Sequence, residues 1–119
     1  MTIDLWPDEL RLTAGRATLK LSFNDGTASE LSAELLRVES PSAEVKGHGP
    51  GQETLVSGKR KVLISAIEPV GNYAVRLTFS DGHSTGIYTW TYLAKLGRER
   101  ETIWAEYLKK LEAKGQTRG

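Results

Sequence analysis

The chain has 119 residues, no cysteine and a formal net charge of +1. A chain of this length is typical of one domain. The balanced charge argues against partners held mainly by electrostatic attraction, such as nucleic acid or a membrane surface. No apolar run approaches the roughly 18 residues of a membrane span, and the N-terminal MTIDLWPDEL lacks the features of a signal peptide. We therefore expect a cytoplasmic protein without disulfides or cysteine-ligated metals.

In chain order, the first prominent feature is a short pattern that occurs twice, as LKLSFNDGT at 19–27 and as VRLTFSDGH at 75–83. Each copy alternates apolar and polar residues before an Asp-Gly pair, which predicts a strand and a hairpin turn. The turn predicts a positive φ at Gly82. We expect residues 84–88 to return as the partner strand of the second hairpin. Helical segments are expected after the hairpins, at 32–37 and at 89–96.

Two further strands are predicted, at 9–12 and at 61–67, where apolar residues alternate. The C-terminal segment 98–114 is predicted to form a helix, because apolar residues recur at helical spacing and Gly115 is a typical stop. Its apolar stripe is expected to pack on the domain's own sheet. A homo-oligomer contact through Trp104 is the alternative. Residues 116–119 are expected to fray.

These elements predict an α+β fold. We expect a small antiparallel, twisted β-sheet of about five or six strands, built on the two Asp-Gly hairpins and flanked by short helices and the C-terminal helix. The chain forms a single domain over 1–119, with its core at about 8–97 and the C-terminal helix at 98–114.

A long loop is predicted at 40–58, where Pro41, Pro50 and four glycines occur. Long ordered loops in compact domains are often functional, but a plain surface excursion fits the composition equally well.

The chain has two histidines, His48 in this loop and His83 beside the second hairpin turn. Neutral imidazole is a common ligand of zinc, iron and copper, so the two could converge on one metal with Asp81 or Glu44. No HxH, HxxxH or HExxH spacing supports such a site. The competing interpretation is that His83 hydrogen-bonds within its turn and His48 faces water.

Signals of catalysis are weak. A triad of Ser42, His83 and Asp81 can be drawn, but the chain has so many serines that the drawing carries little weight. There is no GxSxG motif and no phosphate-binding glycine loop.

Three blocks of sequence occur in a recognisable order: LRVESPSAEVKGH at 36–48, VGNY at 70–73 and FSDGHSTGIYTW at 79–90. Together they resemble the gamma-butyrobetaine hydroxylase-like N-terminal domain family, known in bacteria as a stand-alone domain of unknown function. The resemblance spans about residues 10–96.

In the hydroxylases, a similar domain precedes a catalytic domain that depends on 2-oxoglutarate and iron, and it carries zinc on three cysteines and one histidine. The resemblance places the cysteine positions at about Ser40, Ser42 and Val45, and the histidine at His83. Only the histidine is retained, which implies that the zinc site is absent or rebuilt with His48 and carboxylates. A chain of 119 residues leaves no room for the catalytic domain, so no hydroxylase activity is expected.

Similar domains are also fused to P-loop ATPases of the iron–sulfur carrier type in plastids. The resemblance therefore implies a non-catalytic accessory or protein-interaction module with a protein partner, linked to iron or iron–sulfur metabolism. The balanced charge already argued against a nucleic-acid or membrane partner. The expected contact surface comprises Ser40, Ser42, Glu44, His48, Asp81 and His83. The alternative is a metal-binding protein that holds iron or zinc through His83 and His48.

Overall fold

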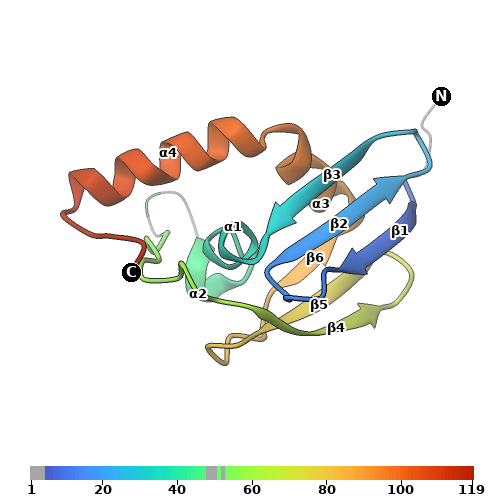
Figure 1. Cartoon of the computed structure of the whole chain (residues 1–119), viewed down its shortest axis with the longest axis horizontal. Coiled ribbons are helices and arrows are strands. Elements are labelled where there is room, and N and C mark those ends of the chain that lie inside the picture. The colour runs from blue at the N-terminus through green and yellow to red at the C-terminus, as the bar shows by residue number, and fades with distance from the viewer. Residues whose placement is uncertain (1–4, 48–50, 52) are drawn as a thin grey trace.

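The computed structural model describes residues 5–47, 51 and 53–119. In chain order the elements are β1 (Pro7–Leu12), β2 (Thr18–Phe23), β3 (Ala28–Ser32), α1 (Ala33–Val38), α2 (Ala43–Lys46), β4 (Ile64–Val70), β5 (Ala74–Phe79), β6 (Ile87–Thr89), α3 (Trp90–Arg98) and α4 (Arg100–Ala113) (Figure 1). The predicted α+β class is confirmed.

The strands form two antiparallel sheets of three, ordered β1-β2-β3 and β4-β5-β6, where the sequence had suggested one sheet. The reason is local. Ser32 and Thr89 end the third strand of each sheet and cap the helix that follows, accepting hydrogen bonds from the N–H of Leu35 at 3.0 Å and of Tyr92 at 3.1 Å. The chain is therefore two successive β-β-β-α units, and each helix start ends its sheet at three strands.

The repeated Asp-Gly pattern gives two turns of the same geometry. Gly26 and Gly82 have φ angles of 87° and 93°, as predicted for Gly82. In each turn the glycine N–H donates to the carbonyl oxygen of the preceding phenylalanine, Phe23 at 3.0 Å and Phe79 at 2.9 Å. The aspartate then accepts the backbone N–H two residues on, at 3.0 Å in the first turn and 3.1 Å in the second. The sequence repeat is therefore a structural repeat.

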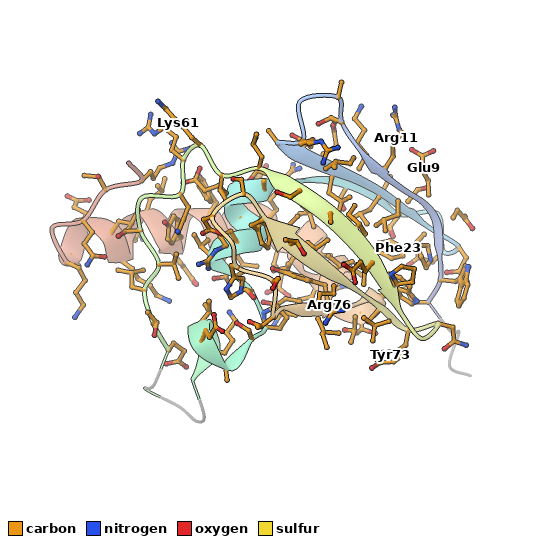
Figure 2. The ribbon with its side chains drawn as sticks, turned by 90° about the horizontal axis from the view of Figure 1, so that it is seen from below. Glu9, Arg11, Phe23, Lys61, Tyr73 and Arg76 are labelled. Carbon is orange, nitrogen blue, oxygen red and sulfur yellow. The ribbon has the colours of Figure 1, made fainter. Side chains whose placement is uncertain are left out.

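The two sheets share one core. Both contribute buried side chains to a single cluster, which includes Leu19, Leu21, Phe23, Leu31, Ile64, Val75, Leu77, Phe79 and Tyr88. The side chains between the two sheets are visible in Figure 2, which looks onto β4 and β5 from below. Arg16 joins the sheets through its backbone, because its carbonyl accepts the N–H of Ile64 at 2.9 Å.

Several element boundaries differ from the predicted ones; β1, for example, starts at Pro7 and not at 9. β4 starts at Ile64, because residues 59–62 form a turn closed by a Val62 N–H to Lys59 carbonyl bond of 3.1 Å. β6 is shorter and later than the segment 84–88. The predicted loop 40–58 contains the short helix α2.

α4 confirms the predicted C-terminal helix, and its apolar stripe faces inward except at exposed Leu108. Tyr107 and Leu111 are buried, and half-buried Trp104 packs against both hydrophobic clusters of the protein. The expectation that residues 116–119 fray is wrong, because the carbonyl oxygens of Thr117 and Arg118 accept hydrogen bonds from Gly58 and Arg60. Among the described residues, no helix has the length and apolar character needed to cross a membrane.

Candidate functional site

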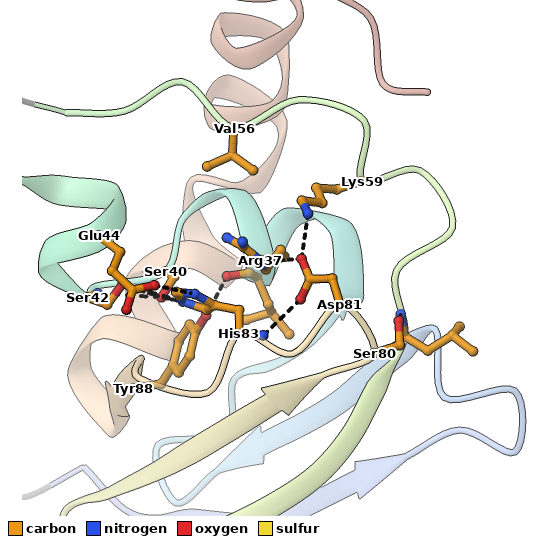
Figure 3. Close-up of polar contacts among 12 residues, drawn as sticks. Arg37, Ser40, Ser42, Glu44, Val56, Lys59, Ser80, Asp81, His83 and Tyr88 are labelled. Atoms are coloured by element: carbon orange, nitrogen blue, oxygen red, sulfur yellow. Dashed lines mark hydrogen bonds and ion pairs between the residues drawn. The ribbon is translucent and has the colours of Figure 1, made fainter.

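His83 is the centre of a polar cluster at the end of the sheets where α1 and α2 lie (Figures 1 and 3). Its Nε2 lies 2.9 Å from Ser40 Oγ and 3.4 Å from Ser42 Oγ. On the other side of the ring, Nδ1 lies 3.1 Å from Glu44 Oε2. His83 is only 7% exposed and Ser40 is fully buried, so most of this cluster belongs to the interior.

Two tyrosines hold the serine segment in place. The Tyr88 hydroxyl donates to the carbonyl of Leu36 in α1, and the Tyr92 hydroxyl donates to the carbonyl of Glu39. Burial raises the pKa of both tyrosines well above the usual value, so both hydroxyls stay protonated donors. The end of α1 is thus fixed on the second β-β-β-α unit, which brings Ser40 and Ser42 to the His83 ring.

Asp81 forms a second part of the cluster. Its Oδ2 lies 2.8 Å from Arg37 Nε and 2.6 Å from Lys59 Nζ, and its Oδ1 accepts the backbone N–H of His83 at 3.1 Å. Burial acts to raise the pKa of Asp81, but the bonds from Lys59, the His83 N–H and Arg37 outweigh it and lower the pKa to about 2. Asp81 therefore carries its charge at any physiological pH and ties α1 to the hairpin.

The environment of the His83 ring favours its neutral form. Burial lowers its pKa below 6.5 and the Arg37 charge adds to that effect, while Glu44 and Asp81 act in the opposite direction. Because the Glu44 carboxylate can only accept, Nδ1 carries the proton, and Nε2 accepts a hydrogen bond from the Ser40 hydroxyl.

Ser40, His83 and Glu44 are arranged like the serine, histidine and acid of a hydrolase triad, but the site is closed to substrate. Ser40 has no exposed surface, and a Cβ added at Gly86 would lie 2.4 Å from its Oγ. A substrate carbonyl has no place beside that oxygen, which nucleophilic catalysis requires. Asp81, the acid of the triad drawn from the sequence, contacts the His83 backbone and not its ring.

The positions that the resemblance implies for a zinc site do converge in part. Ser40, Ser42 and His83 meet, whereas Val45 is a buried apolar side chain without a donor atom. Structural zinc requires thiolate, imidazole or carboxylate ligands, so two neutral hydroxyls and a valine do not fit it. Within the described residues, no group of three or more His, Asp or Glu side chains could hold a metal ion. His48 lies outside the described residues.

A groove of about 560 Å³ lies next to this cluster, between α4, the segment 53–56 and the chain around α2. Its floor is apolar and includes Val38, Val45 and Tyr107, while exposed charged side chains such as Glu106 and Lys110 line its rim. Sequence reasoning missed the groove. The helical stripe of α4 predicted one wall, but nothing periodic in 53–56 predicted the other.

Fold and site together define a small α+β domain of two β-β-β-α units, with a closed polar cluster at one end and an open groove beside it. The model of the family described as "Gamma-butyrobetaine hydroxylase-like, N-terminal" matches residues 10–94. The chain therefore belongs to this family, as the resemblance implied.

Solved structures agree. Two NMR solution structures are 42% and 45% identical to the chain, with TM-scores of 0.81 and 0.82, and they cover 95% and 99% of it and 89% and 90% of their own chains. A crystal structure of a protein with unknown function, of the DUF971 family from Acidithiobacillus ferrooxidans, is 42% identical with a TM-score of 0.63, covering 76% of this chain and 91% of its own. A comparison with curated proteins gave no match.

Proposed function

We propose that this cytoplasmic domain is a non-catalytic accessory module that binds an extended segment of a partner protein in the groove beside α4. The observation that carries the proposal is the groove itself, about 560 Å³ in volume, with an apolar floor and a charged rim. Partner-binding surfaces commonly combine a hydrophobic centre with a polar rim. The link to iron or iron–sulfur metabolism rests on the family resemblance.

The backbone of one groove wall supports an extended ligand. Residues 53–57 are neither helix nor strand. Thr54 donates to Val45 at 2.7 Å, but the N–H groups of Leu55 and Val56 donate to no other group within the described part of the chain. Because the N–H groups of adjacent residues in an extended chain point to opposite sides, an extended peptide in the groove can pair with one of the two.

The groove also adjoins the surface expected from the sequence. Glu39, Val45 and Lys46 line it, and Glu44, the exposed member of the His83 cluster, lies on the same short helix α2. The buried members Ser40, Ser42 and His83 then act as support that fixes this wall.

Site-specific photo-crosslinking in the native cell tests the proposal. A photoreactive amino acid replaces Glu106 or Lys110 at the groove rim, and Glu68 on exposed β4 is the matched control position. We expect one adduct of the same partner from both groove positions and none from Glu68. Adducts from all three positions alike, or from the control alone, would refute the groove as the binding site.

Metal binding through His83 and His48 is the alternative function. Its support is that the His83 imidazole already lies beside the Glu44 carboxylate, 3.1 Å away. Elemental analysis of tag-free protein, purified without chelator from iron- and zinc-supplemented medium, separates the two functions. Near one metal per chain that is lost on His83→Ala would establish the metal function, and its absence leaves the accessory role.

A further inference from the structure

The C-terminal residues pair with a distant segment of the chain. The N–H of Gly58 donates to the carbonyl of Thr117 at 3.0 Å, and the N–H of Arg60 donates to that of Arg118 at 2.8 Å. Gly115, with a φ of 65°, ends α4 and turns the chain toward these donors. The donors lie two residues apart, but the acceptors are the carbonyls of consecutive residues, so the two segments meet in an irregular pairing and not in a strand ladder.

This pairing delivers the Arg118 guanidinium to Glu34. Its Nε and Nη2 donate to the two carboxylate oxygens of Glu34 at 3.0 Å and 2.7 Å, a bidentate pair. The same guanidinium lies 5.0 Å from the centroid of the Trp104 ring. The planar guanidinium group can donate two parallel hydrogen bonds to a carboxylate, and the face of an aromatic ring attracts its positive charge. The site therefore recognises guanidinium specifically.

Glu34 requires a cationic partner, whereas most of the segment that supplies it is exposed to solvent. The Glu34 side chain is 6% exposed, and among the described residues Arg118 is its only hydrogen-bond or ion-pair partner. A buried charge without a partner is strongly unfavourable. Residues 116, 117 and 119 are exposed, so little buried surface resists their release.

We propose that Glu34, Trp104 and the backbone of 58–60 form a receptor for an arginine-bearing segment. Residues 117–118 occupy the receptor within the chain, and a partner protein's segment of the same chemistry occupies it by displacing them. The backbone of the receptor follows Val56, the last residue of this segment that lines the groove. The proposal for the receptor does not depend on whether the groove binds a partner.

A peptide titration of the 119-residue chain tests this proposal. The probe is a dye-labelled peptide with the sequence KGQTRG of residues 114–119, followed by fluorescence polarisation. In the wild type the chain's own segment competes at an effective concentration on the order of millimolar. We therefore expect the peptide to bind Arg118→Ala with a Kd at least about tenfold lower than the wild type, and Arg11→Ala, an exposed site on β1, to behave as the wild type.

Two peptide controls keep the test independent of protein folding. Peptides with alanine or lysine in place of the arginine should bind Arg118→Ala at least about tenfold more weakly, because neither forms the bidentate pair. Adding Glu34→Gln should remove binding of the arginine peptide. Equal Kd values for wild type and Arg118→Ala, or for the arginine and alanine peptides, would overturn the proposal. A wild-type dimer that Arg118→Ala abolishes would also overturn it, because a second copy would then be the occupant.

Discussion

At the scale of single residues, the last position of the repeated turn, Thr27 in the first copy and His83 in the second, gives the two copies different contacts. In the first copy the Thr27 hydroxyl donates to Asp25 in its own turn at 2.6 Å, and both residues are exposed. In the second copy the equivalent residue is His83, whose ring crosses to Ser40 and Glu44. The same backbone geometry therefore serves a local turn in one unit and a tertiary connection in the other.

The Ser40 hydroxyl should contribute measurably to stability. Ser40→Ala removes the shorter hydroxyl contact of buried His83 Nε2 and leaves only Ser42 Oγ at 3.4 Å. A poorly satisfied buried polar atom costs about 1–3 kcal/mol. Urea unfolding should show a loss of that size, whereas Ser65→Ala on the exposed side of β4 should change little. Equal stability of Ser40→Ala and the wild type would contradict the hydrogen bond assigned to this atom.

Asp81 predicts a pH dependence of folding. Its pKa falls from the usual 3.8 to about 2 in the folded chain, so its stabilisation is complete above about pH 4 and is lost as the pH falls toward 2. The linked free energy is about 2 kcal/mol. Asp81→Asn should flatten the stability curve between about pH 4 and 2. Asp25→Asn should flatten it less, because Asp25 forms no ion pair among the residues that the structure describes.

At the scale of elements, α3 approaches β3 through a glycine. A Cβ at Gly97 would lie 2.5 Å from Ser29 Oγ and 2.9 Å from Ser29 Cβ. The close approach seats the helix of the second unit on the sheet of the first. On the other side, Arg37 of α1 binds Asp81 in the hairpin of the second unit. The two units thus interlock, each contributing a helix that contacts the other.

Gly97→Ala should weaken this contact. Overpacking of this kind costs about 1–3 kcal/mol, which exceeds the gain in helix propensity. Gly15→Ala, where no atom lies within 4 Å of the new Cβ, is the matched control. Adding Ser29→Gly should recover part of the loss, measured as a coupling in a double-mutant cycle. Strict additivity would show that the two residues do not meet.

At the scale of the whole molecule, Trp104 connects the parts. Its ring packs against the main core, against the small cluster of Val38, Tyr107 and Leu111, and under Arg118. A side chain with these contacts is part of the domain's own packing and not a free contact face. This placement favours the structural role expected for the α4 stripe.

Trp104→Ala should therefore lower the free energy of unfolding by about 2 kcal/mol or more, because it removes large half-buried apolar surface. Leu108→Ala, at an exposed position of the same helix, should have a much smaller effect. Light scattering at high protein concentration should give the same molar mass for the wild type and both variants. A mass that falls only on Trp104→Ala would instead support a homo-oligomer through this helix.

The sequence predicted what local patterns determine. Alternation and the Asp-Gly pairs predicted the strands and the positive φ of Gly82, helical spacing predicted α4, and three blocks of residues indicated the family. The meeting of His83 with Ser40 and Ser42 followed from that resemblance and not from spacing.

Only the tertiary structure decided the rest, because contacts between distant segments leave no periodic signal in one sequence. The division into two sheets depends on where the capped helices start, and the groove depends on how α4 packs beside residues 53–56. The ion pair between Arg118 and Glu34 joins residues 84 positions apart in the sequence. No local preference encodes such a pair. The composition of residues 116–119 alone had led us to expect fraying.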